Sequence, residues 1–329
     1  MKLVYTKNIL LLLTFGIAIF ALSFFAYAQT IAPSLSLGLS PAQPGANTEV
    51  VATIQSAFND LSTARISWTL NGKITAEGDG ITTFRFTTGV LGTVSRVSTV
   101  VLTKAGEKLG GSFEIRPAEV DVMWEALTYK PPFYKGKSVA TSGSKIRVSA
   151  IPHMIIQGEK VSPEKLTYTW QQNRNVLGSL SGVGKQSVII DAPYPHEETY
   201  VAVQISSPDG KSGAQKGITI ATQNPQIVLY EKSPSEGVKY ENALPADFNL
   251  AEEEITIRAE PYFFSTEDLS GKNVSFVWSL NSKEIKPATR INEITLRKES
   301  GEGIAQLELV VKNAAKALQE AVARMSIQF

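Results

Sequence analysis

The sequence contains no cysteine among its 329 residues. This absence excludes disulfide bonds, cysteine-ligated zinc, a thiol nucleophile and a lipid-modified cysteine behind an N-terminal leader. An excess of charge of one sign is also missing, since 32 Lys and Arg residues face 31 Asp and Glu residues. A strongly basic surface is the usual footprint of nucleic-acid binding, so we expect no nucleic acid partner.

Side chains suited to catalysis near neutral pH are scarce. The chain has two histidines, His153 and His196, and neither lies in a motif. No Gly-x-Ser-x-Gly nucleophile elbow occurs. The stretch "GSLSGVGKQS" (178–187) resembles a phosphate-binding loop, but Ser179 stands where the first glycine belongs and Gln186 replaces the hydroxyl ligand. We therefore predict no catalytic residue and no cofactor, and interpret this stretch as a connection between strands.

Acidic residues gather at 252–254 and 265–268, which raises the question of calcium. Calcium sites usually combine several Asp or Asn residues at close spacing, and no Asp-x-Asp run exists here. We interpret both stretches as solvated acidic loops and predict no metal site.

A long apolar run is confined to the N-terminus, where Lys2 and Lys7 precede "ILLLLTFGIAIFALSFF". The run ends in "AYA" (26–28), which has small residues where a signal peptidase reads the chain, so cleavage would leave Gln29 first. The alternative is a retained membrane anchor, because the run is long enough to span a bilayer. Both interpretations predict an exported protein at the cell surface, in the periplasm or outside the cell, with membrane contact only through this segment.

One frame, apolar-x-Trp-x-x-Asn, occurs three times: "ISWTLNGK" around Trp68, "YTWQQNRN" around Trp170 and "FVWSLNSK" around Trp278. Alternation of apolar and polar residues is typical of half-buried strands, and a buried indole fills the space between packed sheets. We predict that Trp68, Trp170 and Trp278 mark the cores of three similar domains. The alternative is that they form a sugar-stacking face.

The flanking sequence repeats as well. "IRVSAIPHMII" (146–156) and "ITIRAEPYFF" (255–264) share an alternating pattern that ends in Ala-x-Pro, and we expect the proline to stop the strand ladder. Three further strand candidates follow each tryptophan. The single helix-like stretch, 313–323, falls where a hairpin belongs and is interpreted as one. Many short strands without alternating helices predict antiparallel sandwiches.

The repeats define an N-terminal leader, 1–28, and three domains in tandem, 31–117, 118–225 and 226–329. The joints between the domains are short and contain proline, which restricts bending. The sequence thus predicts an all-β chain of three antiparallel β-sandwiches in tandem behind a leader helix. We expect these domains to form a semi-rigid rod.

The strand frame resembles that of polycystic-kidney-disease-type (PKD) domains and related bacterial immunoglobulin-like domains of exported, uncharacterised surface proteins. "YTWQQNRN" and "FVWSLNSK" match the strand in which that family carries an aromatic-x-Trp frame followed by a turn. The resemblance spans nearly all of 31–329 and implies that the three antiparallel β-sandwiches are Ig/PKD-like, with an immunoglobulin-like fold. The acidic and glycine-rich continuation of the family is absent, and no biochemical role carries over.

The start of the second domain, "YKPPFYKGK" (129–137), combines aromatic residues, prolines and three lysines. Such mixtures are enriched at exposed recognition patches. We identify a possible interaction patch here, composed of Tyr129, Pro131, Pro132, Phe133 and Tyr134. The alternative is a proline-stiffened irregular strand that protects a sheet edge.

The function that the sequence favours is that of an exported, non-enzymatic surface or envelope protein, acting as a spacer, an adhesion module or an assembly module. Its partner would be an envelope or extracellular protein, or a glycan. A carbohydrate-binding accessory protein is the alternative, and a hydrolase with an unrecognised site is a more distant one.

Overall fold

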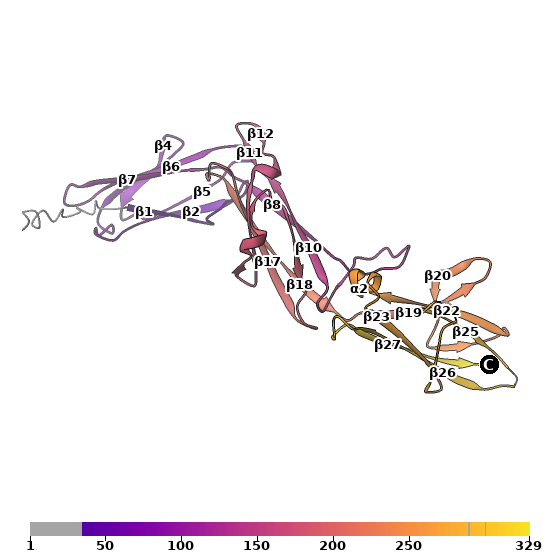
Figure 1. Ribbon diagram of the computed structural model, residues 1–329. Coiled ribbons are helices and arrows are strands. Elements are labelled where there is room, and N and C mark those ends of the chain that lie inside the picture. The colour runs from indigo at the N-terminus through magenta and orange to yellow at the C-terminus, as the bar shows by residue number, and fades with distance from the viewer. Residues whose placement is uncertain (1–34, 289, 300) are drawn as a thin grey trace, which may run out of the picture. The chain divides into compact units, whose positions relative to one another are not determined.

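The computed structural model describes residues 35–288, 290–299 and 301–329 (Figure 1). The predicted leader, its cleavage after Ala28 and the first residues of the first predicted domain lie outside these described residues. Within the described ranges, no helix is both long and apolar enough to cross a membrane. Strands dominate and pair mostly antiparallel, so the predicted all-β fold class is confirmed.

The first sandwich has two sheets. One sheet has the order β1-β2-β5 and the other has the order β4-β3-β6-β7. Trp68 lies on β3, with Ile66 on the same buried face. The strands are β1 (Leu35–Ser40), β2 (Glu49–Ser56), β3 (Arg65–Leu70), β4 (Lys73–Asp79), β5 (Thr83–Thr87), β6 (Ser95–Leu102) and β7 (Lys108–Ile115).

The second sandwich repeats this arrangement. Its sheets have the orders β16-β10-β8 and β14-β13-β17-β18-β9, with β15 also pairing with β13. A buried cluster around Trp170 fills the space between them. The strands are β8 (Glu119–Ala126), β9 (Ala140–Thr141), β10 (Lys145–His153), β13 (Thr167–Gln172), β14 (Asn175–Val176), β15 (Gly182–Val183), β16 (Ser187–Asp191), β17 (Glu198–Ser206) and β18 (Gly213–Gln223), with a small hairpin β11 (Ile155–Ile156) and β12 (Glu159–Lys160) and two 3₁₀ turns, η1 (Pro163–Lys165) and η2 (Gly178–Leu180).

The third sandwich has sheets of order β20-β19-β22-β25 and β21-β27-β26-β23-β24 around a core that contains Trp278. β26 ends at Asn313 and β27 begins at Glu320, so the hairpin interpretation of 313–323 is confirmed. The elements are β19 (Gln226–Ser233), β20 (Gly237–Ala243), β21 (Asp247–Asn249), β22 (Glu254–Tyr262), α2 (Thr266–Ser270), β23 (Val274–Leu280), β24 (Lys283–Ile285), β25 (Glu293–Arg297), β26 (Ile304–Asn313) and β27 (Glu320–Gln328).

The repeated prolines do not end their strands, contrary to the prediction. Pro152 stays within β10 and pairs with Val120 of β8, whereas the pairing of β10 with β16 stops at Ser149. Pro261 likewise lies in β22 opposite Ile227 of β19, beyond the reach of β25. Only one of the two ladders stops, because the missing N–H is tolerated where no strand pairs on that side.

The internal contacts divide the chain into two compact units, and the boundary runs through the first sandwich. One unit holds the described residues up to Gly38 together with 52–84 and 97–113. The other holds 39–51, 85–96 and 114–329, and therefore contains all of the second and third sandwiches. The domain limits at 117/118 and 225/226 stay predictions. The interaction site at residues 127–139, described below, lies with its contacts entirely within the second unit.

Candidate interaction site

The three tryptophans of the repeated frame are completely buried, each with 0% of its surface exposed. Each indole N–H donates to a backbone carbonyl in the segment that leads into the next strand of the facing sheet. The same contact therefore recurs in every sandwich, and none of these three indoles is open to a ligand. The three bonds run from Trp68 to Ile81 O (2.8 Å), from Trp170 to Lys185 O (2.7 Å) and from Trp278 to Ile291 O (2.9 Å).

The asparagine of the frame is a turn residue. Asn71, Asn173 and Asn281 have φ of 51°, 49° and 49°, and the residue after each is also in the left-handed region. Two successive left-handed residues are typical of the tight type I′ hairpin, and asparagine tolerates this conformation better than most residues. The Asn173 carboxamide Oδ1 also accepts the N–H of Tyr200 at 2.9 Å. The whole frame thus serves the fold.

Gln172 replaces the leucine found at this position in the other two copies. Its side-chain amide donates to Thr199 Oγ1 at 3.0 Å and to Asp191 O at 3.4 Å. Thr199 is completely buried, so the Gln172 amide provides a hydrogen-bond partner that this hydroxyl needs inside the sandwich.

The other polar candidates do not assemble into a site. His153 Nε2 lies 3.1 Å from Asp121 Oδ2 on the partly exposed end of β10. The 178–187 stretch holds η2 and β15, with no helix behind it to receive a phosphate. Among the described residues, no group of three His, Asp or Glu side chains could hold a metal ion. The predicted acidic loop at 265–268 instead opens the short helix α2.

The predicted patch lies in the segment that joins β8 to β9, residues 127–139, which we call the aromatic loop. This loop pairs with the third sandwich at the end of β22. Tyr129 N donates to Phe264 O and Phe263 N donates to Tyr129 O, both at 2.7 Å. Thr128 forms an antiparallel bridge with Ser265. The backbone of the aromatic loop is therefore a short strand-like extension of the third sandwich.

A buried carboxylate receives the side chain of Tyr129. Glu260 of β22 is 0% exposed, and its oxygens accept the hydroxyls of Tyr129 (2.7 Å) and Tyr240 (2.8 Å) and Nε of Arg258 (3.0 Å). Arg258 also binds Glu293 at 2.7 Å. A buried carboxylate is costly unless it is paired and hydrogen-bonded, so these partners are required for its burial.

The same surroundings change the acidity of the two tyrosines. Burial, and then the hydrogen bond to Glu260, raise the pKa of Tyr129 well above its ordinary value. Burial and the same carboxylate raise the pKa of Tyr240 to about 12. Both hydroxyls therefore remain protonated donors at any physiological pH.

A second polar cluster joins the two sandwiches beside the aromatic loop. Gln319, in the β26–β27 turn, is 0% exposed. Its Nε2 donates to Ser142 O (2.8 Å) and Thr141 Oγ1 (3.2 Å), and its Oε1 accepts Ser265 N (3.2 Å) and Asn313 Nδ2 (2.9 Å). One amide thus bridges the second sandwich and two segments of the third, with all four of its hydrogen-bonding positions used.

Asp268 anchors this cluster from α2. Burial alone would raise its pKa, but the ion pair with Lys316 and hydrogen bonds from Asn313 and Asn273 outweigh burial and lower the pKa to about 2. The carboxylate is therefore ionised and fully engaged at neutral pH, which leaves it little capacity as a cation ligand.

The tip of the aromatic loop divides the predicted patch into two groups. Pro131 is buried, and the Tyr134 ring lies edge-on to Tyr262 and Phe263, with centroids 5.5 and 5.8 Å apart. Tyr129 and Tyr134 therefore hold the loop on the third sandwich, with the buried Pro131 between them in the sequence. Pro132 is exposed, and Phe133 is 86% exposed.

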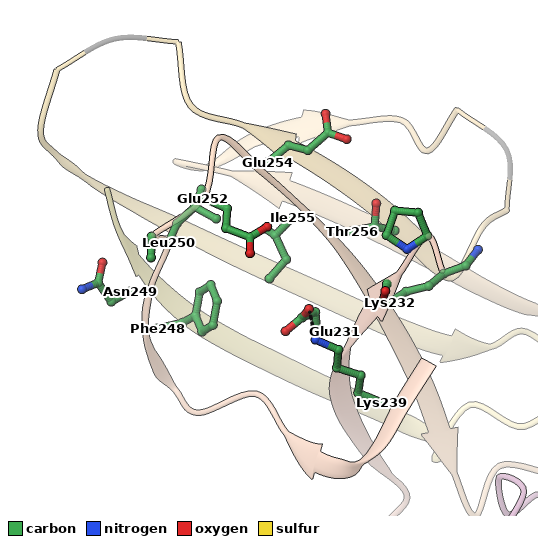
Figure 2. Close-up of a pocket in the computed structure, with 13 residues that line it drawn as sticks. Glu231, Lys232, Lys239, Phe248, Asn249, Leu250, Glu252, Glu254, Ile255 and Thr256 are labelled. Atoms are coloured by element: carbon green, nitrogen blue, oxygen red, sulfur yellow. Dashed lines mark hydrogen bonds and ion pairs between the residues drawn. The ribbon is translucent and has the colours of Figure 1, made fainter. Parts of the chain in front are cut away.

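A separate hollow of about 500 Å³ lies within the third sandwich, between the end of β19 and the segment that precedes β22 (Figure 2). Phe248, Leu250 and Ile255 contribute its apolar surface. Its charges are largely paired, since Lys239 Nζ lies 2.7 Å from Glu231 Oε1. The acidic stretch at 252–254 contributes Glu252 and Glu254 to the lining.

No known family profile matches the chain, and no curated protein matches it. Solved structures with some likeness include three N-terminal domains of the bacteriophage RB49 highly immunogenic outer capsid protein, at 11% identity, 90% coverage of this chain, 97% coverage of that chain and a TM-score of 0.27. The central fibronectin-III array of RIM-binding protein is 12% identical, with 90% of this chain and 96% of that chain covered and a TM-score of 0.29. A Bacteroides ovatus glucan-utilization protein, SGBP-B, solved with a mixed-linkage heptasaccharide, is 11% identical, with 86% of this chain and 63% of that chain covered and a TM-score of 0.20. At such scores these likenesses carry no argument about function, and the immunoglobulin-like fold rests on the sheets of this chain.

Proposed function

We propose that this protein is an exported, non-enzymatic surface or envelope module whose second and third sandwiches form one fixed connector. The observation that carries this proposal is the buried polar seam between them, in which Glu260 and Gln319 are both completely buried and fully bonded. An assembly or spacer protein needs defined geometry between its domains, and such a seam supplies it.

The energetics of the seam support the proposal. Parting the two sandwiches would leave Glu260 short of a donor and would strip the Gln319 amide of its contacts with Ser142 and Thr141. Each hydrogen bond exchanged for water in this way costs about 0.5–1.5 kcal/mol, and the bond to the charged Glu260 costs about 1.5–3 kcal/mol. Only Asn224 and Pro225 separate β18 from β19, and so short a joint restricts motion further.

Export rests on the N-terminal sequence, and the kinship with PKD-type surface domains rests on the Trp frame. Both remain part of the proposal. N-terminal sequencing of the protein from its native cells tests the first: a chain that starts at Gln29 supports cleavage, and a cytoplasmic chain with Met1 intact contradicts export.

A pair of spin labels tests the fixed connector. Because the chain has no cysteine, Gln215→Cys in β18 and Val277→Cys in β23 provide the sole labelling sites, both outward-facing. Pulsed electron spin measurements should give one narrow distance distribution, as narrow as that of a reference pair within the third sandwich, Val277→Cys and Thr295→Cys. Adding Gln319→Ala should broaden it. A broad distribution in the parent chain would refute the connector.

The alternative of a carbohydrate-binding protein finds little support in the aromatic residues. The Phe133 ring is tilted by 54° from its neighbour Tyr240, so the two do not form a flat stacking surface. Retention of the protein on a polysaccharide column, abolished by Phe133→Ala, would reverse this preference.

A further inference from the structure

We propose that the tip of the aromatic loop is a docking device for an anionic lipid surface, with Phe133 entering the interface and Lys130, Lys135 and Lys137 facing the headgroups. This inference names the partner of the interaction module proposed above and therefore rests on that proposal. It replaces two expectations from the sequence, that membrane contact is confined to the N-terminal segment and that the partner is a protein or a glycan. Tyr129 makes the hydrogen bonds between the aromatic loop and the third sandwich, and Phe133 at the tip takes no part in them.

The backbone conformation at the tip of the loop is unfavourable for Phe133. Tyr134 N donates to Pro131 O at 3.3 Å, which closes a four-residue turn with Pro132 second and Phe133 third. Phe133 has φ of 68°. Proline second and a left-handed third residue define a type II turn, in which glycine or asparagine is strongly preferred at the third place. A bulky residue with positive φ is an outlier that persists where surroundings or function require it.

Packing does not account for Phe133. Its side chain is 86% exposed, more than any other large hydrophobic residue in the described part of the chain. Its one ring contact with another described residue is a tilted approach to Tyr240, with centroids 6.3 Å apart. Neither backbone preference nor burial favours phenylalanine over glycine at this position, which leaves a role outside the protein.

The loop around Phe133 is held firmly. Tyr129 is bound to Glu260, Pro131 is buried, and Tyr134 lies on Tyr262. A projecting apolar side chain on a fixed support loses little conformational freedom on binding, so more of its burial energy appears as affinity.

The charge of the tip selects an anionic partner. Lys130, Lys135 and Lys137 are all exposed, and none forms an ion pair within the described residues. Residues 127–139 contain no Asp or Glu. Three unneutralised lysines supply attraction to anionic headgroups, and the exposed aromatic residue beside them supplies an apolar group that a bilayer can bury.

A protein or a sugar fits the tip less well than a bilayer does. Lysine is depleted in the cores of protein interfaces. The tilted rings of Phe133 and Tyr240 provide no flat platform for a sugar. A bilayer requires neither a matched pocket nor a flat platform, only charge and an apolar side chain that reaches the acyl boundary.

A polarity-sensitive fluorophore on Phe133→Cys tests the inference, because this is the single thiol of the full chain. Its emission should shift to the blue with vesicles of equal parts phosphatidylcholine and phosphatidylglycerol, and stay unchanged with phosphatidylcholine alone. Replacing the three tip lysines by Gln should weaken this response about a hundredfold, at about fivefold per lysine. The matched control removes three exposed lysines of the second sandwich, Lys160, Lys165 and Lys185, and should respond like the parent.

Three results would overturn the inference. The first is an emission that does not change with anionic vesicles. The second is an equal shift with soluble polyglutamate, which would indicate an acidic polymer or protein as the partner. The third is a lower melting temperature of Phe133→Gly, which would show that Phe133 serves stability; we expect an equal or higher melting temperature. A narrow distance distribution between the spin labels, combined with no response to vesicles, would contradict the lipid inference and leave the fixed connector standing. A broad distance distribution would contradict the fixed connector itself.

Discussion

Replacing Tyr129 by Phe removes a single oxygen from the seam and so isolates the bond to Glu260. The ring and its packing remain, and the Glu260 carboxylate keeps Tyr240 and Arg258 as donors. A hydrogen bond to a charged group contributes about 1.5–3 kcal/mol to stability. The loss should fall mainly on the attachment of the aromatic loop, because the core around Trp278 lies elsewhere.

Hydrogen exchange of the full chain measures this attachment directly. The amides of residue 129 and of Phe263 donate across the seam, so they exchange when the loop detaches. A loss of about 1.5–3 kcal/mol corresponds to roughly ten- to a hundredfold faster exchange at these two amides. Amides of β26, which belong to the sandwich itself, should keep their protection, since local openings differ in free energy.

The control is Tyr194→Phe, which removes the hydroxyl of a tyrosine that is 67% exposed. Exchange at the seam should not change in this variant. If Tyr129→Phe and Tyr194→Phe exchange alike, the bond between Tyr129 and Glu260 contributes nothing, and the reasoning that a buried carboxylate fixes the loop is wrong.

Three further changes test other parts of the structure. Asp268 has a folded pKa of about 2 against an ordinary 3.8, so its contribution of about 2 kcal/mol is present above pH 4 and lost as pH falls to about 2; acid unfolding of Asp268→Asn should lack this step. Trp170→Ala should cost about 3–5 kcal/mol in denaturant unfolding, and an unchanged midpoint would contradict its core role. Asn173→Ala should destabilise the chain by about 1–2 kcal/mol more than Asn173→Gly, because only the latter accepts a φ of 49° freely; equal melting temperatures would argue against the turn assignment.

The fold could be predicted because its signals are local. Alternation places Ile66 and Trp68 on one face of β3 without reference to distant residues, and a left-handed asparagine marks the end of that strand. The same signals recur in the other two copies. The prediction that proline stops the strand ladder was wrong because a strand has two neighbours. The missing N–H of Pro152 affects pairing on one side of β10 only, and pairing with β8 continues on the other side.

The seam could not be predicted, because its partners are far apart in the chain. Tyr129 and Glu260 are separated by 131 residues, and Thr141 and Gln319 by 178. In the alternation of β22, Glu260 falls on the face opposite Ile257, which is the pattern of a solvent-exposed residue. The aromatic loop covers that face, and no property of the β22 sequence records the cover.

The first strand of the second sandwich is followed by "LTYKPPFYKGK" (127–137), and the first strand of the third sandwich by "SPSEGVKY" (233–240). These two Tyr- and Lys-containing segments meet at one carboxylate. In the second sandwich the segment becomes the aromatic loop and supplies Tyr129; in the third it becomes β20 and supplies Tyr240. The two oxygens of Glu260 each accept one of these hydroxyls. A segment that recurs after the first strand of a sandwich therefore acts twice in the same joint, once reaching forward to the next sandwich and once receiving the preceding one. The repeated Trp frame forms the core of each sandwich. The joint between the second and third sandwiches instead needs two tyrosines, Tyr129 and Tyr240, and each sandwich supplies one of them.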